Sequence, residues 1–127
     1  MREEARERAR RLAEAARDRN AENVVALEVG ALTSFADAFV LATAGSDRQA
    51  RSIADAVTEA ARAAGTELLG VEGYEEGRWI LIDGGDVIVH VFVRDAREHY
   101  DLDRLWGDAP KIALPEPTPA SRGARAQ

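Results

Sequence analysis

The 127-residue chain contains no cysteine, which excludes a disulfide framework and any metal site built from thiolates. It also lacks an apolar run near the roughly 18 residues that would indicate a membrane-spanning helix. Its first residues are charged and do not form the apolar segment of a secretory signal. We therefore expect a cytoplasmic protein with no membrane segment.

Proline is absent from the first 109 residues, and all four prolines lie from Pro110 onward. Hydrophobic residues make up 46% of the chain and charged residues 31%, which is typical of a globular domain. We assign residues 1–107 to a single domain, with an N-terminal helix over about 2–20. The proline-bearing tail, 108–127, is predicted to be disordered.

The net charge of −6 is unevenly distributed, because residues 21–106 contain sixteen acidic residues and only seven arginines. Affinity for nucleic acid comes mainly from Lys and Arg side chains that neutralise phosphates. An acidic centre therefore argues against direct, specific binding of RNA or DNA. It favours a basic protein as the partner.

Hydrophobic periodicity predicts a mixed sheet covered by helices. The run at 38–44 is apolar without alternation, as in a strand buried on both faces. A helix follows, with Ser46 as its N-cap and Gly65 at its C-terminal end. The remaining strands are predicted at 22–29, 67–71, 80–83 and 86–93, with short helical turns at 94–100 and 101–106. This order predicts an α/β (α+β) sandwich with a mixed five-stranded sheet.

The last two predicted strands form a hairpin around Gly84-Gly85, which we take as a two-residue loop. This loop would place Trp79 opposite His90, Leu81 opposite Ile88 and Asp83 opposite Asp86. One face of the hairpin is then entirely aliphatic, as a core face is. The other carries Trp79, Asp83, Asp86, His90 and Phe92, a mixture typical of a surface that meets a partner.

An enzyme is the alternative to a binding protein. The Gly45-Ser46 turn ends a strand and opens a helix, so its backbone N–H groups could face a phosphate. Asp37, Asp83 and Asp86 are the carboxylates that could then hold magnesium. However, Ser46 is equally a helix cap, and acids beside a hairpin turn are ordinary surface residues. We therefore predict no catalytic residue, cofactor or metal site.

The binding alternative rests on an acidic run with aromatics inside it. Residues 67–86 contain six acids and one arginine, and Trp and Tyr are frequent anchors at interfaces. For His90, a satisfied half-buried histidine and an interface donor both remain open. The candidate residues for binding a basic protein partner are Tyr74, Glu75, Arg78, Trp79, Asp83, His90 and Phe92.

Two long motifs resemble those of the ribosomal silencing factors, the Iojap family. The first is FADAFVLATAGSDRQARSIADAV at 35–57. The second is GVEGYEEGRWILIDGGDVIVHVF at 70–92, followed by Arg97, Tyr100 and LWGDA at 105–109. The resemblance covers about residues 5–110.

The resemblance implies a nucleotidyltransferase-like topology without the catalytic carboxylates of those enzymes. It also implies binding to the large ribosomal subunit through ribosomal protein L-fourteen. A member bound there prevents the small subunit from joining and so represses translation. Members form homodimers, and neither a cofactor nor catalysis is implied.

Overall fold

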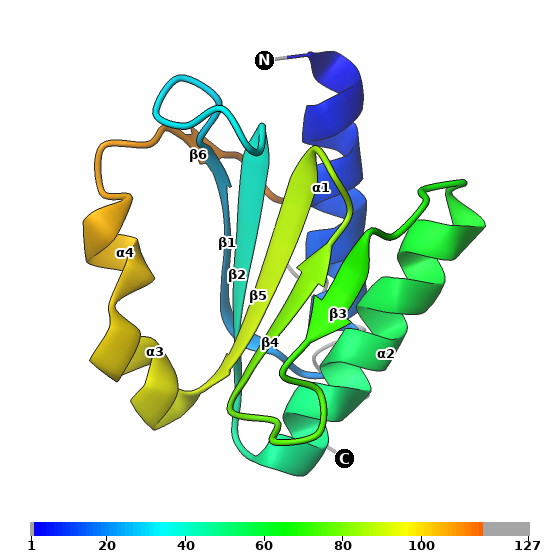
Figure 1. Cartoon of the computed structure of the whole chain (residues 1–127), viewed down its shortest axis with the longest axis vertical. Coiled ribbons are helices and arrows are strands. Elements are labelled where there is room, and N and C mark those ends of the chain that lie inside the picture. The colour runs from blue at the N-terminus through cyan, green and yellow to red at the C-terminus, as the bar shows by residue number, and fades with distance from the viewer. Residues whose placement is uncertain (1, 116–127) are drawn as a thin grey trace.

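The computed structural model describes residues 2–115, which form one sheet with helices on both faces (Figure 1). The elements in chain order are α1 (Glu3–Arg17), β1 (Glu22–Glu28), β2 (Ala38–Ala44), α2 (Asp47–Ala63), β3 (Gly70–Glu72), β4 (Trp79–Asp83), β5 (Val87–Val93), α3 (Arg94–Tyr100), α4 (Leu102–Leu105) and β6 (Lys111–Ile112). The predicted α/β sandwich is therefore confirmed, with a sixth strand added to the predicted five.

The sheet is built around two parallel strands, β2 and β5, in the order β3-β4-β5-β2-β1-β6. All other strand pairs are antiparallel. Every residue of β2 is buried, so the prediction of a strand covered on both faces is confirmed. No helix within residues 2–115 is long and apolar enough to cross a membrane.

Helices α1 and α2 lie together on one face of the sheet (Figure 1). The aliphatic hairpin face packs beneath them, as predicted, through Ile80, Ile82, Val87, Val89 and Val91. The apolar stripe of α1 is also buried, through Ala5, Ala9, Leu12, Ala13 and Ala16. Because four of these five side chains are alanines, the helix backbone can lie close to its neighbours.

The N-terminus of α2 is fixed by side-chain hydrogen bonds. Ser46 Oγ accepts a hydrogen bond from Gln49 N at 3.1 Å, which confirms the predicted cap. Gln49 Oε1 accepts from Gly45 N at 2.6 Å, one residue earlier than in a standard capping box. At the other end Gly65 has φ of 79° and stops the helix.

Helices α3 and α4 lie on the opposite face of the sheet (Figure 1). A second apolar cluster forms beneath them and includes Phe39, Leu41, Ile88 and Phe92. The half-buried Trp79 and Trp106 pack against this cluster. The mixed face of the hairpin, which we predicted to be a partner surface, is therefore largely a second core.

The predicted register of the hairpin is wrong by two residues. Trp79 pairs with Phe92, Leu81 with His90 and Asp83 with Ile88. The two-residue loop is Gly85-Asp86, with φ of 87° at Gly85, as a type II′ turn requires at its first central position. Moving the loop by one residue moves the register by two, so the composition of the two faces stays as predicted.

The predicted disorder of 108–127 is wrong for residues 108–115. Strand β6 pairs with β1 through Ile112–Ala26 and Lys111–Leu27 contacts. Arg10 Nε of α1 donates to Ala113 O at 3.2 Å, and Ile112 is buried in the core. A two-residue strand among prolines has too little pattern to be seen in the sequence. Residues 116–127 lie outside the described part of the chain.

Removing the side chain of Ile112 tests whether β6 belongs to the core. We expect Ile112→Ala to lower the free energy of unfolding by about 2–4 kcal/mol, because a buried side chain leaves a cavity. Lys111→Ala, on the exposed neighbour, is the control and should change it by less than about 0.5 kcal/mol. Chemical denaturation measures both, and equal small effects would contradict a packed β6.

Candidate functional site

The loop between β3 and β4, residues 73–77, carries two exposed acids and is tied to α2. Tyr74 Oη donates to Asp55 Oδ1 at 2.9 Å. Arg51 Nη1 donates to the backbone oxygen of Glu75 at 3.0 Å. The hydrogen bond to Asp55 raises the pKa of Tyr74. These contacts fix the loop before any partner arrives.

Two glycines allow this loop to lie against the rest of the domain. Gly73 has φ of 80°, and a Cβ there would lie 2.2 Å from the backbone oxygen of Trp79. Gly77 has φ of 70°, and a Cβ there would lie 2.8 Å from Arg51 Nη1. Both positions therefore require glycine for space as well as for conformation.

Trp79 is half-buried and lies among other rings. Its indole Nε1 donates to His90 Nδ1 at 3.1 Å. Its ring centroid lies 4.6 Å from that of Tyr100 and 5.1 Å from that of Phe92. The exposed part of Trp79 is thus the edge of a packed aromatic cluster rather than a free side chain.

His90 and Phe92 are buried, with 5% and 0% of their surfaces exposed. Neither can touch a partner directly in this conformation, because α3, α4 and Phe39 cover that face. Burial lowers the pKa of His90 to about 4. Since Nδ1 accepts from Trp79, the ring proton is on Nε2, which is buried and has no hydrogen-bond partner among residues 2–115. Of the two alternatives for His90, the structure favours a neutral core histidine.

The other candidate residues lie nearer the surface. Arg78 is exposed, and its Nη1 lies 3.3 Å from Asp95 Oδ2. Asp83 is half-buried and accepts a hydrogen bond from Gly85 N at 2.9 Å, so it stabilises the turn. The structure therefore separates the predicted set into an accessible group, Tyr74, Glu75, Arg78 and part of Trp79, a turn residue, Asp83, and a buried pair, His90 and Phe92.

Several exposed apolar residues were missing from the predicted set. Leu69 directly precedes the outer strand β3 and Val71 lies within it, whereas Phe35, Tyr100 and Leu105 lie on the side of α3 and α4. The Leu-x-Val alternation at 69–71 was visible in the sequence. What was not visible is that β3 stands at the edge of the sheet, where nothing covers it.

The residues of the enzyme alternative do not meet. Gly45-Ser46 follows the last residue of β2, whereas Asp37 precedes its first residue. Asp83 and Asp86 lie at the same end as Asp37, beside the start of β5. A seven-residue strand separates the two ends by about 20 Å. These carboxylates therefore cannot act on a phosphate at Gly45-Ser46.

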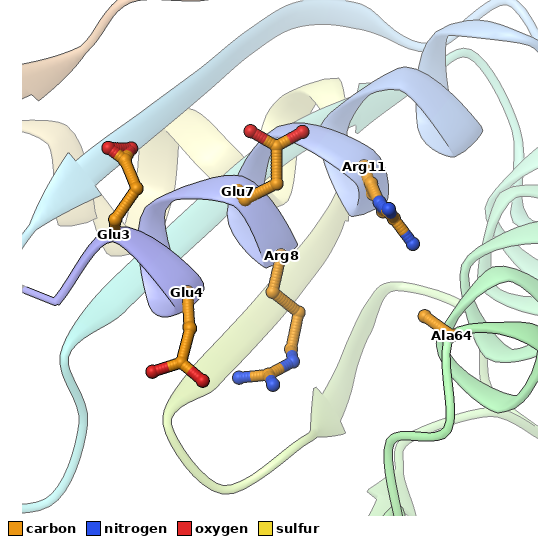
Figure 2. A pocket seen from close by; sticks show the side chains of 6 residues that line it. All are labelled: Glu3, Glu4, Glu7, Arg8, Arg11 and Ala64. Carbon is orange, nitrogen blue, oxygen red and sulfur yellow. The ribbon is translucent and has the colours of Figure 1, made fainter.

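The carboxylate of Asp86 forms ion pairs with arginines at the start of the chain. Arg8 extends from α1 toward the hairpin turn, as Figure 2 shows, and forms an ion pair with Asp86. Arg2 lies 3.6 Å from the same carboxylate. A cavity of about 370 Å³ beside Arg8 is lined by Glu3, Glu4, Glu7, Arg8, Arg11 and Ala64. Its acids and arginines nearly balance, and the described residues contain no cluster that could hold a metal ion.

A second pocket lies at the other end of β2, and Thr43, Arg97 and Asp103 are among its lining residues. Arg97 donates to Thr43 Oγ1 at 2.7 Å and binds Asp103 with two hydrogen bonds, of 2.8 and 3.0 Å. These bonds lower the pKa of Asp103. Because its guanidinium is committed to protein groups, Arg97 is a structural residue rather than a free phosphate ligand.

Comparison with known proteins identifies a family for this chain. The sequence model of the family described as "Ribosomal silencing factor during starvation" matches residues 2–127. The chain belongs to the ribosomal silencing factor family. A ribosomal silencing factor of Halalkalibacterium halodurans is 45% identical over 97 residues, covering 76% of this chain and 83% of that protein. For that of Bacillus subtilis the identity is 42%, and the coverage is 76% and 82%.

A solved structure supports the fold independently. The crystal structure of a protein from Chromobacterium violaceum superposes with a TM-score of 0.79 and is 33% identical in sequence. The superposition covers 93% of this chain and 92% of that protein. This chain and that protein therefore share the same fold.

The buried neutral His90 predicts an acid-sensitive fold. Its pKa is about 4 in the folded chain and about 6.5 when unfolded. Only the unfolded state takes up a proton in this window, so the free energy of unfolding falls as pH drops from about 6.5 to about 4, by up to about 3 kcal/mol. His90→Gln should flatten this slope, whereas His99→Gln, at the exposed histidine, should not. Urea unfolding across this pH range measures the slope of the free energy of unfolding against pH. If both variants kept the slope of the unmodified chain, the assignment of His90 as a buried neutral histidine would be refuted.

The two-glycine loop gives a second prediction, with a matched control inside the chain. Gly65 and Gly73 have φ of 79° and 80°, but a Cβ at Gly65 would meet nothing within 4 Å. Gly65→Ala should cost about 1 kcal/mol of stability, from conformation alone. Gly73→Ala should cost at least about 2 kcal/mol more, because the Cβ also displaces β4. Thermal unfolding measures the difference, and equal losses would show that the contact is unimportant.

Proposed function

We propose that this chain binds the large ribosomal subunit through ribosomal protein L-fourteen and thereby prevents the small subunit from joining. The observation that carries the proposal is the family match over residues 2–127. Translation falls because the bound domain occupies space that the small subunit needs. The factor acts in the cytoplasm as a binding protein, without a cofactor or a catalytic step.

The accessible candidate residues support a basic protein partner. Glu72, Glu75 and Glu76 are exposed around the fixed loop, and none of them forms an ion pair within the described residues. Proteins bound to ribosomal RNA need positive charge to neutralise phosphates. An acidic loop beside an aromatic edge is therefore complementary to such a protein.

Rigidity suits a factor that works by steric exclusion. The loop at 73–77 is held by Tyr74, Arg51 and two glycines, so binding orders little additional chain. A small ordering cost leaves more of the contact energy available for affinity. A fixed domain of this kind needs only to stay bound at the subunit interface.

We include a homodimer in the proposal. The side of α3 and α4 exposes Phe35, Tyr100 and Leu105 at 61%, 49% and 70% of their surfaces. Exposed large apolar side chains on one side of a domain favour association. Sedimentation equilibrium tests this directly, and a monomer at all concentrations would remove the dimer from the proposal.

Reversing the charge of the loop tests the ribosome contact. We expect Glu75→Lys with Glu76→Lys to weaken co-sedimentation with purified large subunits by about tenfold, because like charges then face each other. The control is Glu4→Lys with Glu7→Lys on α1, which makes the same charge change near the opposite end of the sheet. Equal binding by both double variants and the unmodified chain would place the contact elsewhere.

Trp79→Ala provides a second test of the same surface. Because the indole packs against three other rings, we expect a loss of about 3 kcal/mol of folding stability as well as weaker binding. Co-sedimentation is therefore compared below the unfolding temperature of the variant, which circular dichroism establishes. Unchanged binding by the folded variant would remove Trp79 from the contact.

A further inference from the structure

Strand β3 forms an open edge of the sheet. It pairs with β4 on one side only, and all three of its residues are exposed. The backbone groups along its outer side have no strand partner within the described residues. Figure 1 shows β3 as the last strand at this end of the sheet, next to β4. Such an edge is a template for another strand.

Exposed apolar side chains accompany this edge. Leu69 is 69% exposed and Val71 is 41% exposed. Because they are two residues apart in an extended segment, both side chains lie on the same face of the strand. Val71 pairs with Ile82, whose side chain is in the core beneath the helices. Leu69 and Val71 therefore continue the apolar layer of the core to the outer edge of the sheet.

The surroundings of the edge are acidic. Residues 67–76 include four acids and no basic residue, and all four acids are exposed. On α2, Asp55 is exposed and accepts the hydrogen bond from Tyr74. Along the chain, Glu72 is one residue and Glu67 four residues from Val71, whereas the nearest basic residue, Arg78, is seven residues away. A second strand arriving here meets a negative field.

This charge decides between possible occupants. In a dimer joined through two β3 strands, Glu67 and Glu72 of one copy would lie near the same acids of the other, and like charges across paired strands destabilise. Nucleic acid is repelled by the same field. An extended segment rich in Lys or Arg is attracted, and its apolar side chains can cover Leu69 and Val71.

We propose that the open edge of β3 accepts an extended basic segment of another protein as a seventh strand of the sheet. Backbone hydrogen bonds along residues 69–72 hold the segment, and alternate side chains rest on Leu69 and Val71. The acids around the edge select for Lys and Arg at the remaining positions. The choice of a basic partner rests on the proposed function, whereas the open edge and its apolar side chains do not.

The probe is a synthetic peptide of alternating lysine and valine, about seven residues long, matching the length of a typical strand. Titrating it into the isotope-labelled chain should shift the backbone amide signals of residues 69–72 and of their β4 partners. A peptide N-methylated at alternate residues cannot donate its backbone hydrogen bonds and should bind at least about tenfold more weakly. A peptide of alternating glutamate and valine should not bind.

Leu69 and Leu105 supply a matched pair of variants, since they are 69% and 70% exposed. Leu69→Ser should lower the affinity for the lysine–valine peptide by about three- to tenfold, because an apolar contact is lost. Leu105→Ser should leave its affinity unchanged. The amide spectrum of each variant shows whether the fold is retained. Equal effects of the two substitutions would overturn the proposal.

Two further outcomes would also overturn it. One is shifts spread evenly over all acidic surfaces, and the other is equal binding of the N-methylated peptide, because both indicate attraction by charge alone. The peptide assay contains no ribosome, so its result is separate from co-sedimentation. If the chain binds large subunits but not the peptide, strand addition is refuted and the proposed function is kept. If it binds the peptide but not large subunits, strand addition is kept and the proposed function is refuted.

Discussion

The burial of the parallel pair β2 and β5 is the constraint on which the rest of the structure depends. All seven residues of β2 are buried, and six of the seven in β5. Two central strands that expose neither face to water require cover on both sides. The chain provides two different covers. Alanine-rich helices pack on one face, and an aromatic cluster beneath two short helices packs on the other.

Because the central strands are covered on both faces, the residues that can contact another molecule lie at the periphery of the sheet. The ends of β2 and β5 hold internal ion pairs, Arg8 with Asp86 at one end and Arg97 with Asp103 near the other. The mixed hairpin face, which includes a histidine, is closed by α3 and α4. What stays accessible is the acidic loop, the edge of Trp79 and the outer strand. These features are typical of a binding surface.

Elements with a strong local pattern could be predicted from the sequence. The buried strand at 38–44, the Ser46 cap and the Gly65 stop depend on neighbouring residues alone, and each was correct. The hairpin register depended on which two of Gly84, Gly85 and Asp86 form the loop, and Gly-Gly and Gly-Asp are both acceptable turn sequences. Because the register error is an even number, the two faces were still assigned correctly.

Features that depend on distant parts of the chain could not be predicted. Strand β6 has two residues, and it exists only because β1 offers an edge and Arg10 holds the chain beyond it. The burial of His90 and Phe92 follows from the placement of α3 and α4, whose own sequences have little apolar pattern. The sequence identified the residues of the mixed face but not the side of the sheet on which the short helices lie.

Ion pairs within the domain determine which charges of the chain are available to another molecule. By segment, the N-terminal helix is basic, yet its arginines are largely paired with acids of the same domain, as in Arg6–Glu28, Arg8–Asp86 and Arg17–Glu14. The acids of residues 67–76 have no such partners among the described residues. Unpaired charges set the field that a partner meets. The accessible surface around β3 is therefore more acidic than the net charge of −6 suggests, and it lies beside exposed apolar side chains that extend the core to an open edge.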